Sequence, residues 1–310
     1  MKNHGFIKAQ RNMIKKISFI SFCLLLTVYS LCSGSTAAEF LMIGVGARPA
    51  GMGGAYTALT DDVNSIYWNP AGLGNMGGTE MTFMHNSWVI DTSYEFFGFA
   101  TPLDIEEYRC VLGFGMHYMD LGSMVGRRDQ VSVPYVFSAS DMAMSIGCGV
   151  KLNLDNSIGI ALKYIEENIE NTRAYAFAAD LGWNYALRYN TRLAVAVQNL
   201  GTGMKYISQE VNLPLNISAG LGYRISGALS LGIDLKQEIY NNRTSLSAGT
   251  EYMVSNVLAL RGGSLLSDKH DMGLTGGFGL KIRDSQLDYA ITAVGDLGPG
   301  HKISLSLKFK

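Results

Sequence analysis

The sequence predicts an all-β protein, a 14-stranded antiparallel transmembrane β-barrel with a short N-terminal hatch, or plug. Three observations lead to this prediction. Apolar and polar residues alternate along most of the chain. The predicted strands are even in number and mostly long enough to cross a bilayer, and the connections between them alternate between long and short.

The alternation has the period of a β-strand from residue 79 to the end of the chain. Between Met142 and Leu152, the even positions hold Met, Ile, Cys, Val and Leu, whereas the odd positions hold Ala, Ser, Gly and Lys. Because side chains alternate between the two faces of a strand, residues 79–310 are predicted to form the barrel. The predicted strands are 79–91, 92–103, 108–121, 138–152, 156–168, 173–185, 191–200, 215–225, 228–238, 243–252, 257–265, 272–282, 285–294 and 300–310.

The connections between these strands differ in length. The two longest, residues 122–137 and 201–214, follow the third and the seventh strand, and every connection after an even-numbered strand is short. Outer-membrane barrels combine long extracellular loops with short periplasmic turns, so the cell outer membrane is the predicted location. The long loops would contact a partner or ligand through Arg127, Arg128 and Tyr206, although a solvated charge cluster is the favoured interpretation of the two arginines and Asp129.

The composition also differs from that of a soluble protein. Charged residues make up 16% of the 310 residues and hydrophobic residues 47%, whereas about 25% charge is typical of soluble domains. The 36 glycines, which follow no collagen period, indicate tight turns and closely packed strands. The net charge is −1 and no basic stripe is present, so the sequence predicts no binding to nucleic acid.

Residues 1–38 have the features of a signal peptide. A pair of lysines precedes an apolar run that is too short for a membrane helix, and small residues follow this run. The sequence leaves open whether the chain starts at Met1 or at Met13. The features are Lys15 and Lys16, the apolar run 17–31, and the small residues before an expected cleavage after Ala37 or Ala38.

Two of the four cysteines lie beyond the predicted signal peptide, at Cys110 and Cys148. In an oxidising compartment these two residues could form a disulfide. Two separate thiols, buried or facing lipid, are the favoured alternative.

Residues 39–78 do not follow the period of a strand and are predicted to fold into the lumen as the hatch. Asp61 or Asp62 can cap a short helix over residues 63–68, and Asn69 followed by Pro70 ends it. An arginine and two carboxylates inside a polar lumen could also pair and hold the hatch, whereas helix capping and turn formation alone are the alternative. The candidate hatch residues are Arg48, Asp61, Asp62, Asn69 and Pro70.

The hatch sequence resembles that of a known family. The stretches Gly46–Tyr56, Asp61-Asp62 and Tyr67–Leu73 are similar to the PorV/PorQ group of outer-membrane proteins, which is UPF0164-like. That group is related to FadL-type transporters, which share the Asn-Pro-Ala-Gly element seen here at Asn69–Gly72. The resemblance spans most of residues 43–310 and implies a 14-stranded barrel with a plug.

The resemblance implies two different functions. PorV-like proteins are components of type IX secretion that handle exported cargo, and this is the function that the sequence predicts. The alternative is a FadL-like transporter or channel that passes hydrophobic small molecules through a lateral opening. The expected partners are therefore outer-membrane lipid together with secretion-system proteins and exported cargo, or with a hydrophobic ligand.

The sequence predicts no enzyme, no cofactor and no metal site. His85 and Asn86 are neighbours on one strand, and His117 and Asp120 differ by three positions, so the members of each pair face opposite sides. A nucleophile, its base and the residue that orients the base must lie within hydrogen-bond reach. The chain also lacks a Gly-x-Ser-x-Gly turn, metal-ligand spacing, a phosphate-binding loop and a cofactor motif.

Overall fold

A computed structural model describes the chain from residue 35 onward, with short gaps. Most of the predicted signal peptide, both candidate start residues and Arg128 lie outside the described residues. None of the helices in the described part has the length and apolar character that a bilayer crossing requires. The described ranges are 35–87, 92–105, 108–127, 133–188, 190–268, 272–294 and 299–309.

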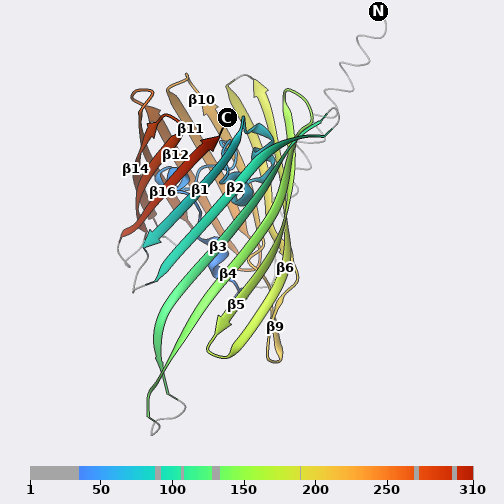
Figure 1. Cartoon of the computed structure of the whole chain (residues 1–310), viewed down its shortest axis with the longest axis vertical. Coiled ribbons are helices and arrows are strands. Elements are labelled where there is room, and N and C mark those ends of the chain that lie inside the picture. Colours follow the sequence, from blue (N-terminus) through green and yellow to red (C-terminus); the bar gives the residue numbers. More distant parts are fainter. Residues whose placement is uncertain are drawn as a thin grey trace, which may run out of the picture. The chain divides into compact units, whose positions relative to one another are not determined.

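Fourteen antiparallel strands close into a barrel, which confirms the predicted fold (Figure 1). Neighbours in sequence are neighbours in the sheet, and β1 pairs with β16 to close it. The strands are β1 (Thr79–Ser87), β2 (Ser93–Ile105), β3 (Tyr108–Gly126), β4 (Tyr135–Lys151), β5 (Asn156–Ile169), β6 (Thr172–Arg188), β7 (Thr191–Gly201), β10 (Asn216–Arg224), β11 (Leu229–Glu238), β12 (Arg243–Met253), β13 (Leu258–Ser267), β14 (Met272–Ile282), β15 (Ser285–Val294) and β16 (Pro299–Phe309).

The two long connections are shorter and more ordered than the sequence predicts. Strands β3 and β4 extend into residues 122–126 and 135–137, because a bulge at Gly122, with a φ of 71°, lets the ladder resume beyond a residue that looks like a break. The connection 201–214 contains a small hairpin of β8 (Met204–Tyr206) and β9 (Gln209–Val211). Three-residue strands are too short to give a periodic signal.

The barrel has its apolar side chains outside and its polar ones inside. On β16, Ile303 and Leu305 are 48% and 41% exposed, whereas Lys302, Ser304 and Ser306 are buried against the lumen. The same contrast repeats on the other strands, where exposed Leu, Ile, Phe and Tyr residues alternate with buried polar or small residues. A soluble barrel would show the reverse arrangement, so this surface is that of a transmembrane barrel.

A disulfide joins β3 to β4 between Cys110 and Cys148, whose Cα atoms lie 6.5 Å apart. The favoured interpretation of two separate thiols is therefore wrong. The two cysteines are diagonal neighbours, because Cys110 pairs in register with Val150 and Cys148 with Leu112. Such a diagonal offset cannot be read from the sequence before the strand register is known.

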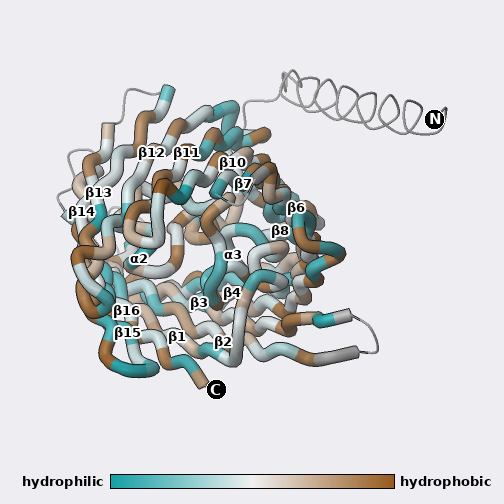
Figure 2. The backbone as a smooth tube through the Cα atoms, turned by 90° about the horizontal axis from the view of Figure 1, so that it is seen from above, coloured by the Kyte–Doolittle hydropathy of each residue, from teal (hydrophilic) through white to brown (hydrophobic). Residues whose placement is uncertain are grey.

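Residues 35–78 lie within the ring of strands (Figure 2). They form η1 (Glu39–Met42), α2 (Ala47–Gly51), α3 (Ser65–Trp68) and η2 (Pro70–Asn75). The helix α3 starts later than expected, and Asn64 occupies its N-cap position without a side-chain hydrogen bond. Asp62 accepts a hydrogen bond from the backbone N–H of Asn64 at 3.0 Å, so it caps the turn that leads into the helix.

Candidate functional site

The hatch is tied to the barrel wall by a network of ion pairs centred on Arg48. Nε and Nη2 of Arg48 each donate to one carboxylate oxygen of Glu251 on β12 at 2.9 Å. Nη1 lies 2.8 Å from Asp61, 3.2 Å from Asp62 and 2.7 Å from the hydroxyl of Tyr56. The fork-like contact with Glu251 is the strong bidentate kind, so Arg48 joins two parts of the hatch to the wall.

The network continues along the wall. Arg261 on β13 contacts Glu251 and, on β15, Asp288, both at 2.7 Å. Arg224 on β10 makes a further ion pair with Asp61. We call the seven residues of these ion pairs the latch: Arg48, Asp61, Asp62, Arg224, Glu251, Arg261 and Asp288.

The sequence analysis missed the four latch residues on the wall. Each is a charged residue within a strand of mostly apolar and small residues, and Glu251, Arg261 and Asp288 are buried on the lumen side. Charges in such positions are normally paired, which is the signal that could have identified them. The signal does not say which hatch residue each one meets.

The two arginines beside Asp61 stabilise the ionised form of its carboxyl group. Burial alone would raise the pKa of the Asp61 carboxyl, but the charges of Arg48 and Arg224 outweigh this and hold the pKa well below its usual range. Asp61 therefore stays ionised at neutral pH. The attachment consists mainly of charges that hold one another, with the hydroxyl of Tyr56 as a neutral partner of Arg48 and Asp62.

A second attachment holds the other side of the hatch without any ion pair. Asn69 donates through Nδ2 to Asn184 on β6 at 2.8 Å and to the carbonyl of Thr57 at 3.0 Å. Its Oδ1 accepts from the backbone N–H of Ala71 at 3.1 Å and so caps η2, where Pro70 occupies the first position. We call the contact of Asn69 and η2 with the wall the seat.

The wall beneath the seat is bare backbone. A Cβ added to Gly159 would lie 2.2 Å from the carbonyl carbon of Pro70, and one added to Gly182 would lie 2.1 Å from Oδ1 of Asn69. Real Cβ atoms do not approach so closely, so β5 and β6 admit η2 only because both positions lack a side chain. By contrast, Gly262 on β13 has no atom within 4 Å of its Cβ position.

The histidines that could have served an enzyme have other partners. His117 is buried and its Nδ1 lies 2.6 Å from the hydroxyl of Tyr94, while Asp120 accepts from the backbone N–H of Gly122 at 2.9 Å. His85 lies on the outer face, opposite to its buried neighbour Asn86. Within the described ranges, no cluster of three or more His, Cys, Asp or Glu could hold a metal ion.

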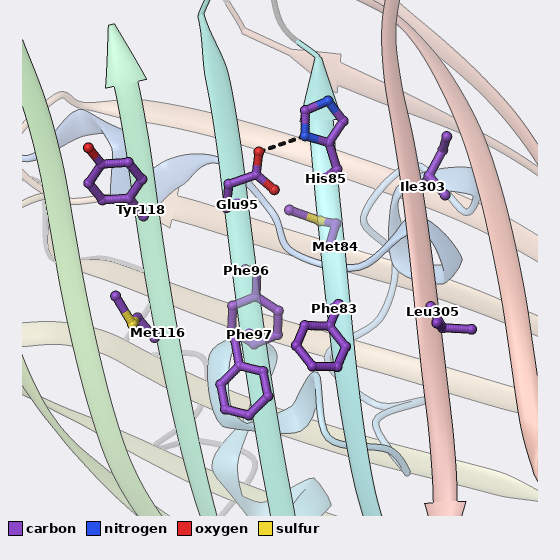
Figure 3. Close-up of a pocket in the computed structure, with 10 residues that line it drawn as sticks. All are labelled: Phe83, Met84, His85, Glu95, Phe96, Phe97, Met116, Tyr118, Ile303 and Leu305. Carbon is purple, nitrogen blue, oxygen red and sulfur yellow. Dashed lines mark hydrogen bonds and ion pairs between the residues drawn. The ribbon is translucent and has the colours of Figure 1, made fainter.

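The outer wall carries an apolar groove of about 430 Å³ over β16 and β1–β3 (Figure 3). The rings of Phe83 and Phe97 lie 5.0 Å apart within it. An ion pair of 2.6 Å between His85 and Glu95 marks one end. The groove can therefore hold an apolar molecule beside one polar contact. Its lining residues are Phe83, Met84, His85, Glu95, Phe96, Phe97, Met116, Tyr118, Ile303 and Leu305.

The predicted loop residues are spread apart. Arg127 is exposed at the end of β3, and Arg128 lies outside the described residues. Tyr206 on β8 is half-buried, and its hydroxyl donates to Glu167 on β5. Tyr206 is therefore held by the wall of the barrel and does not project as a free loop side chain.

The sequence matches the family described as "Uncharacterised protein family (UPF0164)" over residues 30–309. A UPF0164 protein of Treponema pallidum (strain Nichols) is 22% identical in an alignment of 292 residues, which covers 86% of this chain and 68% of that protein. The sequence match thus includes the hatch as well as the barrel.

Solved structures share the fold at low sequence identity. The Ralstonia pickettii toluene transporter TbuX has a TM-score of 0.67 at 15% identity, covering 87% of this chain and 100% of its own. The CymD monoaromatic hydrocarbon channel has a TM-score of 0.68 at 13% identity, covering 86% and 98%. A Pseudomonas aeruginosa FadL homologue has a TM-score of 0.56 at 12% identity, covering 84% and 98%. The chain therefore shares the fold of these barrels, and it belongs to the UPF0164 family.

Proposed function

We propose that this protein is an outer-membrane channel that passes a hydrophobic small molecule through the barrel, past the hatch. The observation that carries the proposal is a lumen filled by a hatch that ion pairs hold on one side and neutral hydrogen bonds hold on the other, with close backbone contacts on both. The similar folds of a toluene transporter and a monoaromatic hydrocarbon channel support the proposal. The exposed apolar wall makes outer-membrane lipid the immediate surrounding.

The proposed path opens on the latch side of the hatch. The two latch pairs that join the hatch to the wall, Arg48 with Glu251 and Arg224 with Asp61, can be replaced by contacts with water when the hatch shifts, because charged groups are well hydrated. The seat has no ion pair to exchange, since Asn69 is held by neutral hydrogen bonds and η2 rests on the backbone of β5 and β6. The segment with Arg48, Asp61 and Asp62 would therefore move, while Asn69 and Pro70 stay in place.

The groove on the outer wall has a role in the same proposal. Its phenylalanine, methionine and leucine side chains suit an apolar molecule that has partitioned into the membrane. The groove would collect such a molecule next to β1 and β2, where the hatch side chains lie behind the wall.

The experiment is an uptake assay in cells that carry the protein in their outer membrane. We expect [¹⁴C]toluene to accumulate faster in these cells than in matched cells without the protein. A hydrophilic solute of similar size should enter both strains at the same rate. Equal toluene uptake by the two strains would contradict the channel proposal.

A role in type IX secretion stays a prediction, and neither the contacts nor the similar proteins favour it over transport. A deletion strain separates the two functions. If cargo accumulates unprocessed in the periplasm of the deletion strain, secretion replaces transport as the proposed function. If its surface and culture-fluid proteins match those of the parent, the secretion role fails.

A further inference from the structure

The first described residues lie beside β8 and the connection between β9 and β10. The backbone N–H of Ala37 donates to the carbonyl of Asn212 at 2.9 Å. Phe40 and Leu41 are buried in one cluster with Met204. The peptide bonds at which the sequence predicts cleavage therefore fall within the folded structure.

Two carboxylates of the wall face each other beside this segment. Asp141 on β4 and Glu167 on β5 are direct partners in register, and both lie on the lumen side. Asp141 is only 8% exposed, and no cation in the described part of the chain forms an ion pair with either carboxylate. Like charges in opposite positions destabilise a sheet, and buried carboxylates normally have a cationic partner. The position is therefore short of one positive charge.

The backbone nitrogen of Ala38 is already at this position. Its N–H donates to the carboxylate of Glu167, which also accepts from the hydroxyl of Tyr206. A free amine at Ala38 would carry a positive charge at neutral pH. This one nitrogen atom could therefore supply the missing cation.

The backbone of Ala38 gives an independent observation. Its φ is +54°, in the left-handed region that alanine rarely adopts, since Cβ then crowds the preceding carbonyl oxygen. A chain that begins at Ala38 has no preceding carbonyl, so this conflict disappears. The conformation suits a first residue better than an internal one.

We propose that the protein is cleaved between Ala37 and Ala38, and that the new α-ammonium of Ala38 forms a buried ion pair with Glu167 and Asp141. Hydrolysis adds one water to the peptide bond, leaving a carboxylate on Ala37 and an amine on Ala38 that takes up a proton. An export peptidase acting on the unfolded chain supplies the catalyst. The mature N-terminus then becomes the third attachment of the hatch, and it exists only in the processed chain.

The test starts with protein purified from the outer membrane. We expect its intact mass and N-terminal sequence to show Ala38 as the first residue. A chain that begins at any other residue overturns the proposal. This measurement does not depend on transport, so it can fail or succeed independently of the proposed function.

The ion pair itself is tested through the reactivity of the α-amine. An acylating reagent at neutral pH should label Ala38 about tenfold more slowly than the amine of an unfolded peptide, because only the unprotonated amine reacts and the carboxylates hold the proton. The lysines of the same molecule serve as the internal reference. Rapid labelling of Ala38 in the folded wild-type protein would overturn the ion pair even if the cleavage site were correct.

Two variants test whether the carboxylates of Glu167 and Asp141 cause the slow labelling of Ala38. Glu167→Gln and Asp141→Asn keep the size of the side chain, and each should speed up the labelling of Ala38 toward the rate of the peptide. The matched control is Glu166→Gln. Glu166 is the residue before Glu167 on β5, but its contacts are different, with Tyr164 and with Arg173 on β6. A rate that changes equally in all three variants would show a general loosening and contradict the proposed pair.

Discussion

The latch and the seat hold the same hatch by different physical means. The latch combines three arginines with four carboxylates from the hatch and from β10, β12, β13 and β15. The seat uses hydrogen bonds of Asn69 and contact with bare backbone at Gly159 and Gly182, without any ion pair. A change of charge is therefore expected to weaken the latch, whereas the seat should respond to a change of shape or of hydrogen bonding.

The largest effect is expected from removal of the central cation of the latch. Arg48→Met leaves Glu251, Asp61 and Asp62 without their shared partner, and loss of one member of a buried ion pair should cost about 3 kcal/mol. Urea unfolding of the purified protein in detergent measures this loss. The exposed Arg127→Met is the control and should change stability by less than about 0.5 kcal/mol. A loss below about 1 kcal/mol for Arg48→Met would mean that the latch does not hold the hatch.

A smaller effect is expected at the seat. Gly159→Ala places a methyl group where the backbone of Pro70 lies, and the forced shift should cost about 2 kcal/mol. Gly262→Ala is the matched control, because its methyl group meets open space. Protease protection of the hatch and urea unfolding should both distinguish the variants. Equal behaviour of the two alanine variants would show that η2 does not rest on β5.

The smallest effect concerns one carboxylate of the latch and its dependence on pH. Asp61→Asn keeps the shape but removes the charge that faces Arg48 and Arg224, which should cost about 1 kcal/mol at pH 7. Because the folded protein lowers the pKa of Asp61, its contribution is complete above the ordinary value of 3.8 and is lost as the pH falls further. Unfolding curves of variant and wild type should therefore converge below pH 3.8. A difference that stays constant down to low pH would contradict an ionic role for Asp61.

The barrel could be predicted from the sequence because its signal is local and repeated. Each strand alternates by itself, and the sum of fourteen such segments determines the number of strands. Arg48, Asp61 and Asp62 could be grouped for a similar reason, since they lie within 15 residues of one another. Features that depend on contacts distant in the chain were not accessible in this way.

The glycines and the charged residues of the wall show which contacts could not be predicted from the sequence. The sequence analysis assigned the glycines to turns and close strand packing, but Gly159 and Gly182 are needed where the hatch touches the wall. Alternation places Glu251 and Asn184 on the lumen face without naming their partners, because the hatch has no period that fixes its register. The pairing of Cys110 with Cys148 was not favoured because it depends on the register between β3 and β4, which the sequence does not give.

The most direct test of the account locks each attachment in turn and measures uptake of [¹⁴C]toluene. Ala47→Cys with Ser304→Cys would link the latch side of the hatch to β16, where the N–H of Ala47 lies 2.8 Å from the serine hydroxyl. Asn69→Cys with Asn184→Cys would link the seat to β6.

A third pair, Thr82→Cys with Ser306→Cys, joins two wall strands and controls for the effect of reductant on the natural disulfide. The account predicts that the latch lock abolishes uptake until a reductant opens it, whereas the seat lock and the wall lock leave uptake close to that of the wild type. Full uptake with the latch locked would contradict a moving hatch.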